Sequence, residues 1–227
     1  NCYLYLIMLS MYLWLVFITL GWLFTFHSLQ SYLSAEGATR GVSFIHSVLS
    51  TLLSGYLYMT HGFSGFGRRT SDKQCFVALL SIGYFLYDSI IGAKLGILES
   101  HFFLHHIVAI SSLAYTLIYR VSGSEIVSCL FFTEASNPFY HAHWFLRNHH
   151  PDCENLLSIN IMAFLTAFVV FRFFLTSVLI FSAMHSRSVP HYVKITGVSL
   201  LIMNMAFSIV LGQQFLCYLG GRPFAVD

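Results

Sequence analysis

The sequence predicts an all-α, polytopic membrane protein with about seven transmembrane helices. Hydrophobic residues make up 57% of the 227 residues and charged residues only 9%, which leaves too little polar surface to cover a water-soluble globule. Apolar runs of about 20 residues, the length that crosses a bilayer as a helix, fill most of the chain between short polar breaks. The membrane is therefore the expected solvent for this fold.

The expected spans follow from these runs and from the breaks between them. The breaks carry glycine, proline and charged residues, as in the Gly-rich, basic stretch at 62–73, and such residues interrupt helices. The first run is too long for a signal peptide and is expected to be a retained span. The spans are expected at residues 2–26, 40–61, 75–92, 101–119, 124–147, 156–184 and 192–219.

A proline interrupts the fifth expected span, at Asn137-Pro138. Proline removes a backbone donor and clashes with the preceding turn, so we expect the helix to kink or break there. Within a membrane such a break is tolerated only where protein or a polar cavity covers the freed backbone groups. The sequence therefore predicts a broken helix beside a polar interior.

Composition and spacing exclude several classes of function. The formal charge is only +2, and Lys and Arg are mostly scattered singly, so no nucleic-acid partner is expected. The five cysteines lie far apart without a C-x-x-C pair, which fits neither a disulfide framework nor a thiolate zinc site. His101 and His105 share a helix face, but without a third ligand at an obvious spacing we expect packing and no metal.

Ionisable residues inside the expected spans carry the functional signal. A charged group at the bilayer centre costs about 3 kcal/mol or more, so such residues should face the bundle interior and find partners there. They are expected to mark a site. The set is His46, Asp88, His105, His106, Glu134, His141, His143 and Arg172, with the amides Asn137 and Asn204 at similar depth.

The adjacent pair His105-His106 is the most specific feature of this set. Neighbouring helix positions point about 100° apart, so one ring can face a cavity while the other meets a second helix. Histidine can move a proton or attack an acyl carbonyl, and Asp88 and Glu134 could orient the ring and stabilise its charged form. The alternative is that these histidines only bridge helices. Asp88 is either an active-site carboxylate or the partner of Arg172 in a buried ion pair.

Several segments together resemble the TLC-domain family, which includes ceramide synthases, a translocon-associated membrane protein and smaller lipid-regulatory relatives. The resemblance runs from Arg40 to the seventh expected span. It rests on Arg40-x-x-Ser43-x-x-His46, on Tyr84 to Asp88, on His105-His106, on the segments 134–139 and 143–146, and on Arg172.

The resemblance implies six helices around a membrane cavity that accepts an acyl chain. It divides the chain into a peripheral first span at 1–39, a TLC-like domain at 40–219 and a short tail at 220–227. His105, His106, Asp88 and Glu134 are the expected catalytic residues. The residues expected to line the cavity or bind lipid are Arg40, Ser43, His46, Tyr84, Asn137, His141 and Arg172.

Three functions remain open at this point. In the first, the protein binds an acyl lipid and regulates membrane lipid composition, with or without histidine-dependent acyl transfer. In the second, it is a non-catalytic accessory subunit of a larger membrane complex. In the third, it is a ceramide-synthase-like N-acyltransferase acting on a sphingoid base or another lipid acceptor. Ceramide synthases carry H-D-x-x-D where this chain keeps one acidic position, Glu134, and has Asn137 at the other.

The expected partners are membrane lipids and, for an accessory role, other membrane subunits. No cofactor is expected, and acyl-CoA enters only as a candidate substrate. The resemblance implies residence in the endoplasmic reticulum, with the mitochondrial inner membrane as the alternative.

Overall fold

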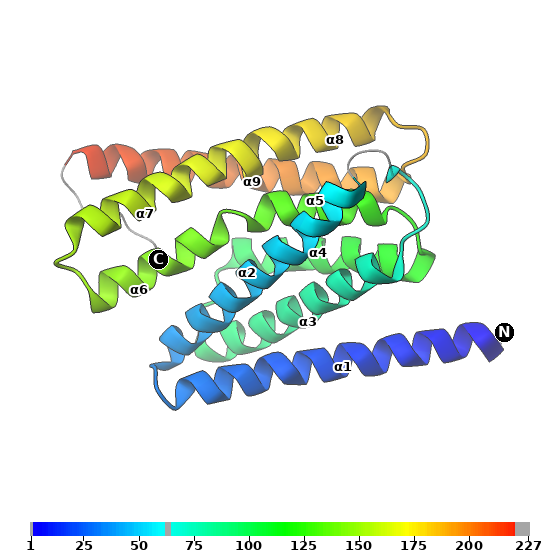
Figure 1. Ribbon diagram of the computed structural model, residues 1–227, viewed down its shortest axis with the longest axis horizontal. Coiled ribbons are helices and arrows are strands. Elements are labelled where there is room, and N and C mark those ends of the chain that lie inside the picture. The colour runs from blue at the N-terminus through cyan, green and yellow to red at the C-terminus, as the bar shows by residue number, and fades with distance from the viewer. Residues whose placement is uncertain (1, 62–64, 221–227) are drawn as a thin grey trace.

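The computed structural model describes residues 2–61 and 65–220, and these residues are almost entirely helical (Figure 1). The described part of the chain contains no strand, only an isolated bridge between Arg69 and Val121. The elements are α1 (Cys2–Gln30), α2 (Ala35–His61), α3 (Asp72–Leu95), α4 (Ser100–Tyr119), α5 (Gly123–Glu134), α6 (Asn137–His149), α7 (Glu154–Ala167), η2 (Phe168–Leu175), α8 (Thr176–His185) and α9 (His191–Leu219).

Among the described residues, six helical stretches are long and apolar enough to cross a membrane, which confirms the predicted fold class. They are Leu9–Gln30, Ala35–Thr60, Asp72–Leu95, Ser100–Tyr119, Glu154–His185 and His191–Tyr218. The remaining expected span, 124–147, is formed by α5 and α6 in succession. Each of these two helices is too short to span a bilayer alone, since about 20 residues are needed.

The break between α5 and α6 lies where the sequence predicted it. Pro138 occupies the first turn of α6, where its missing N–H would have had no partner within the helix. Residues 135 and 136 separate the two helices. The break leaves backbone carbonyls of α5 without helical partners, and the carbonyl of Thr133 becomes an acceptor for Arg172.

The helix that follows is continuous but changes its winding. Residues 154–185 run through α7, η2 and α8, and the middle segment η2 is a π-helix. The Thr176 hydroxyl donates to the Phe171 carbonyl five residues back, at 3.1 Å. A π-segment inside an α-helix is uncommon and frequently marks a functional site. Here it contains Arg172, whose side chain reaches α5.

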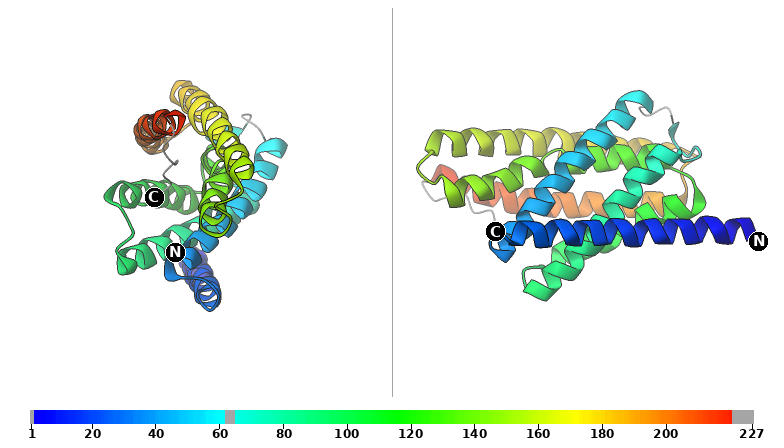
Figure 2. Two further views of the ribbon diagram at one scale, coloured as in Figure 1. Left: turned by 90° about the vertical axis from the view of Figure 1, so that its left-hand side faces the viewer. Right: turned by 60° about the horizontal axis from the view of Figure 1, so that its bottom comes forward.

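Helix α1 lies along the outside of the bundle, against α2 and α3 (Figures 1 and 2). Only 11% of its spanning window is buried. Its inner face carries Trp22, whose indole donates to the Leu80 carbonyl at 3.2 Å. A close approach to α3 occurs at Gly83, where an added Cβ would lie 2.6 Å from Ile18 Cγ2.

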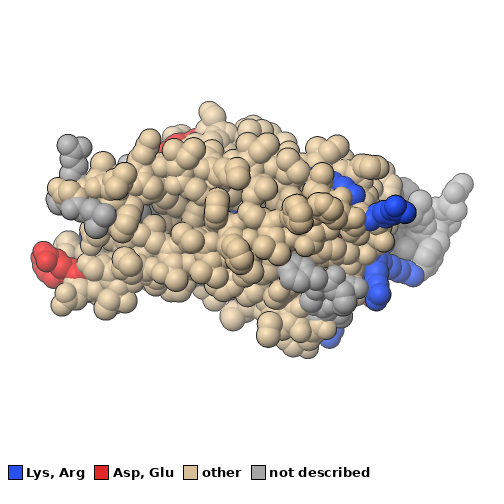
Figure 3. Space-filling view, turned by 90° about the horizontal axis from the view of Figure 1, so that it is seen from above, with Lys and Arg blue, Asp and Glu red and all other residues tan. Residues whose placement is uncertain are grey.

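Charged side chains on the face drawn in Figure 3 gather toward the two ends of the molecule. Lys and Arg appear at one end and acidic residues at the other, with a long, mostly uncharged surface between them. Because an ionised side chain is costly in hydrocarbon, this distribution fits a molecule whose middle is embedded in lipid.

Candidate intramembrane binding site

A polar cavity of about 170 Å³ lies inside the bundle, between α2, α3, α4, α5, α6, η2 and α9. Ten of the eleven residues predicted for the site line it, the exception being His46. They come from α2 (Arg40, Ser43), α3 (Tyr84, Asp88), α4 (His105, His106), α5 (Glu134), α6 (Asn137, His141) and η2 (Arg172). Helices far apart in sequence therefore converge on one chamber.

His46 lies behind the cavity wall and supports it. Its ring stacks on Tyr84 with the ring centroids 3.7 Å apart, and its side chain is almost fully buried. Nε2 lies 3.4 Å from the Ser81 hydroxyl, and Nδ1 lies 3.9 Å from a Glu134 oxygen. The Tyr84 hydroxyl in turn donates to Ser43 at 2.9 Å. His46 thus positions Tyr84, and through it Ser43, at the cavity surface.

Arg172 donates hydrogen bonds to residues on both sides of the break between α5 and α6. Its Nε donates to the Thr133 carbonyl at 3.0 Å, and its Nη2 donates to the same carbonyl and to Asn137 Oδ1 at 3.1 Å. The Asn137 amide then donates to Glu134 at 2.9 Å. The sequence-based alternative of an Asp88–Arg172 ion pair is wrong, since among the described residues no such pair forms. Arg172 is instead used to satisfy the carbonyl freed by the break.

His106 is held by a residue that was not predicted from sequence. Its Nδ1 lies 3.0 Å from the Ser89 hydroxyl, while its Nε2 lies 3.6 Å from Asp88 Oδ2. The second distance is too long for a hydrogen bond. No signal in the sequence distinguished Ser89, because serines in membrane helices commonly bond only to their own backbone.

His105 lies at the junction of two cavities. It lines the polar cavity and also an apolar cavity of about 60 Å³. Its Nδ1 has no hydrogen-bond partner among the described residues. His101, one turn earlier, is about half exposed and contacts Glu99 at 3.2 Å. In the part of the chain that the structure describes, no three His, Cys, Asp or Glu side chains are grouped closely enough to hold a metal.

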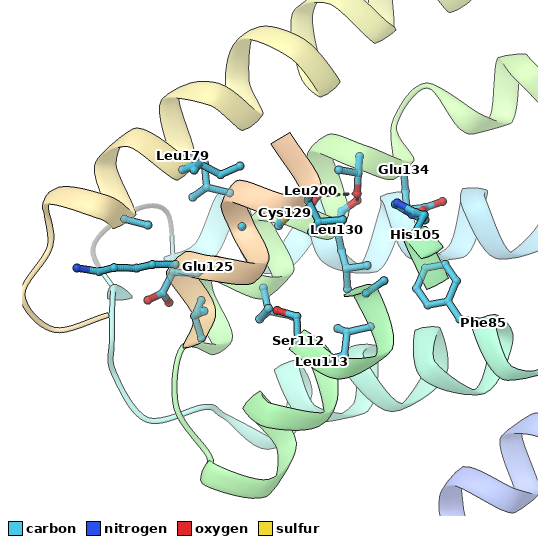
Figure 4. A pocket seen from close by; sticks show the side chains of 18 residues that line it. Phe85, His105, Ser112, Leu113, Glu125, Cys129, Leu130, Glu134, Leu179 and Leu200 are labelled. Atoms are coloured by element: carbon cyan, nitrogen blue, oxygen red, sulfur yellow. Dashed lines mark hydrogen bonds between the residues drawn. The ribbon is translucent and has the colours of Figure 1, made fainter. Parts of the chain in front are cut away.

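The apolar cavity runs from His105 and Glu134 toward the opposite end of the bundle (Figure 4). Between these ends its walls are mostly aliphatic, with Leu113, Leu130 and Leu179 among them. Glu125 lies at the far end in Figure 4, where its carboxylate accepts a hydrogen bond from the Gly67 N–H at 2.6 Å. The polar and apolar cavities share Phe85, His105 and Glu134.

Fold and site together define a multi-pass helical membrane protein with a polar internal cavity and an apolar cavity beside it. The family model of the TLC domain matches residues 36–219, so the chain belongs to the TLC-domain family. No solved structure matches the chain. The family match and the spanning helices support a membrane protein associated with lipids.

Proposed function

We propose that the protein binds an acyl lipid, with the polar group of the lipid in the polar cavity and its chain in the apolar cavity. The observation that carries this proposal is that the polar and apolar cavities adjoin at Phe85, His105 and Glu134, which line both. An amphiphile is the ligand that such a chamber suits, because it satisfies polar and apolar walls at once. By holding acyl lipid, the protein regulates the lipid composition of its membrane.

The polar cavity offers both hydrogen-bond donors and acceptors to a headgroup. Arg40 and Arg172 bring guanidinium groups to it, and Asp88 and Glu134 bring carboxyl groups. Arg40 is only partly engaged, since its nearest carboxylate, Glu36, lies 3.9 Å away and Tyr140 accepts at 3.4 Å. A lipid group with hydrogen-bond donors and acceptors can therefore pair with this wall, which offsets the cost of burying it.

Acyl transfer is the second candidate function, and the arrangement around His106 favours it. In this step a hydroxyl or amine acceptor loses its proton to His106 Nε2 as its oxygen or nitrogen attacks the acyl carbon. The bond from the acyl carbon to the donor's leaving group breaks, and the leaving group takes the proton from His106. General base catalysis of this kind contributes roughly 10²–10⁴-fold to rate.

The test is native mass spectrometry of the purified protein in nanodiscs, combined with identification of the lipids that it retains. We expect the wild type to retain an acyl lipid, and the His105→Gln/His106→Gln variant to lose most of it. His101→Gln is the matched control on the same helix, outside the polar cavity. A wild type that retains no lipid above the nanodisc background would contradict the proposal.

Acyl transfer is tested separately, by adding acyl-CoA and a sphingoid base or other lipid amine or alcohol. A product that forms with the wild type and not with His106→Gln supports it. Lipid retention without any product leaves the binding function and removes the catalytic one.

A further inference from the structure

We infer that Ser89 is a positioning residue that sets the tautomer of His106, placing the ring hydrogen on Nδ1 and leaving Nε2 as a free base directed at the polar cavity. The role of Nε2 as a base rests on the proposed acyl transfer. The tautomer itself does not, because it follows from the hydrogen bonds around Ser89.

The single hydroxyl hydrogen of Ser89 determines which ring nitrogen of His106 carries hydrogen. The Ser89 hydroxyl lies 2.7 Å from the Phe85 carbonyl oxygen, and a carbonyl oxygen can only accept. The single hydroxyl hydrogen is therefore used in that bond. The contact of 3.0 Å between Ser89 Oγ and His106 Nδ1 then requires the imidazole to donate, so that Nδ1 carries hydrogen.

Asp88, beside Nε2 of His106, is the other acceptor for the ring hydrogen, and its contact is longer than that of Ser89. Asp88 Oδ2 lies 3.6 Å from His106 Nε2, beyond hydrogen-bond distance. The His106 side chain is only 7% exposed, so bulk water has little access to the ring. Ser89 makes the shorter contact and therefore determines which nitrogen is protonated in the neutral ring.

Asp88 and Ser89 are adjacent on α3, and each lies beside a different ring nitrogen of His106. The residue that accepts the hydrogen of the ring therefore determines the tautomer. With Ser89 present, the hydrogen stays on Nδ1 and Nε2 keeps its lone pair beside the cavity that Asp88 and His106 line. Without the serine hydroxyl, the acceptor left beside the ring is Asp88. The hydrogen is then expected on Nε2, and the nitrogen at the cavity can no longer accept a proton.

The experiment is nitrogen-15 NMR of protein labelled at histidine and reconstituted in lipid nanodiscs at neutral pH. The His106 signals are assigned as those missing from His106→Gln. We expect the wild type to show hydrogen on Nδ1 alone, Ser89→Ala to show it on Nε2, and Ser89→Thr to keep the wild-type pattern, since threonine can make the same backbone bond. Ser182→Ala, which removes a similar but exposed backbone-bonding serine on α8, should change nothing.

A second variant keeps the test decisive if Ser89→Ala fails to fold. Asp88→Asn leaves the Ser89 contacts in place, so His106 should keep hydrogen on Nδ1. The inference is overturned if the wild type carries hydrogen on Nε2 or on both nitrogens, if Ser89→Ala leaves the pattern unchanged, or if Asp88→Asn alone moves the hydrogen.

The outcomes separate this inference from the proposed function. Lipid retention reports the function, and the NMR pattern reports the tautomer, so either can fail alone. If acyl transfer is observed, Ser89→Ala should lower turnover by roughly 10²-fold with lipid retention unchanged, and Ser89→Thr should restore it. An unchanged turnover in Ser89→Ala would remove the positioning role.

Discussion

At the scale of single residues, the polar interior is held together by side chains that satisfy one another. Arg172, Asn137 and Glu134 form a chain of hydrogen bonds that ends on the Thr133 carbonyl. The hydrocarbon around the bundle offers no substitute for a lost partner, so each member of this chain matters more than on a soluble surface. The same residues line the polar cavity, which couples the stability of the helix break to the shape of the site.

Replacing Arg172 by methionine should destabilise the fold. The change leaves the Thr133 carbonyl and Asn137 Oδ1 without their donor, and a buried acceptor without a partner costs about 1–3 kcal/mol. We expect the free energy of unfolding, measured by denaturant titration in mixed micelles, to fall by about 2 kcal/mol or more. Arg187→Met, at an exposed position after α8, is the control. Equal stability of the two variants would argue against the network.

At the scale of helices, glycine determines how closely α1 and α3 approach. An added Cβ at Gly83 would lie 2.6 Å from Ile18 Cγ2 and 3.3 Å from the Thr19 nitrogen. A side chain here therefore meets the backbone of α1 as well as a movable methyl group. The contact also brings Trp22 onto Tyr84, with ring centroids 5.9 Å apart, so the peripheral helix is linked to the cavity wall.

Gly83→Leu should separate α1 from α3. Its bulk is incompatible with the observed distance between the helices, and Trp22, which is 6% exposed in the native fold, should become accessible. In a Trp14→Phe/Trp144→Phe background, where Trp22 is the sole indole, we expect a clear shift and increased quenching of its fluorescence. Gly21→Leu adds the same side chain to α1 where nothing lies within 4 Å, and should leave the emission unaltered.

At the scale of the whole molecule, the apolar cavity adjoins the polar cavity and extends toward the far end of the bundle. Glu125 and Glu134 lie at its two ends and are nine residues apart on one helix, which corresponds to roughly 14 Å of helical rise. This length is close to half of the about 30 Å hydrocarbon core of a bilayer. The lining of the apolar cavity therefore extends along α5 for about the depth of one leaflet, the direction that the acyl chain would take under the proposed function.

A side chain that fills the apolar cavity should favour lipids with shorter acyl chains or prevent lipid binding. Gly197 lines the cavity from α9, and its added Cβ would lie 3.6 Å from Ile180, so the helix contact tolerates a side chain while the cavity loses space. For Gly197→Leu we expect less retained lipid and shorter chains by mass spectrometry. Gly212→Leu, on the same helix with nothing within 4 Å, is the control. Identical retained lipids in Gly197→Leu and Gly212→Leu would mean that the acyl chain does not occupy the apolar cavity.

The sequence alone determined the helical class, the position of the break at Pro138 and half of the residues that line the polar cavity. The physical reason is local. In lipid every backbone group must be satisfied within its own segment, so an apolar run of sufficient length becomes a helix. An ionisable side chain in such a run must turn inward, which is why hydropathy alone assigns residues such as Asp88 and His105 to one site.

Only the tertiary structure decided which of these residues are partners. The pairing of Ser89 with His106, the use of Arg172 for the Thr133 carbonyl and the place of His46 behind the wall depend on how each helix is rotated about its axis. Lipid is as apolar as leucine, so hydropathy does not specify that rotation, which is set by close packing and by interhelical hydrogen bonds. The π-segment around Arg172 and the apolar cavity beside the polar one follow from the same packing.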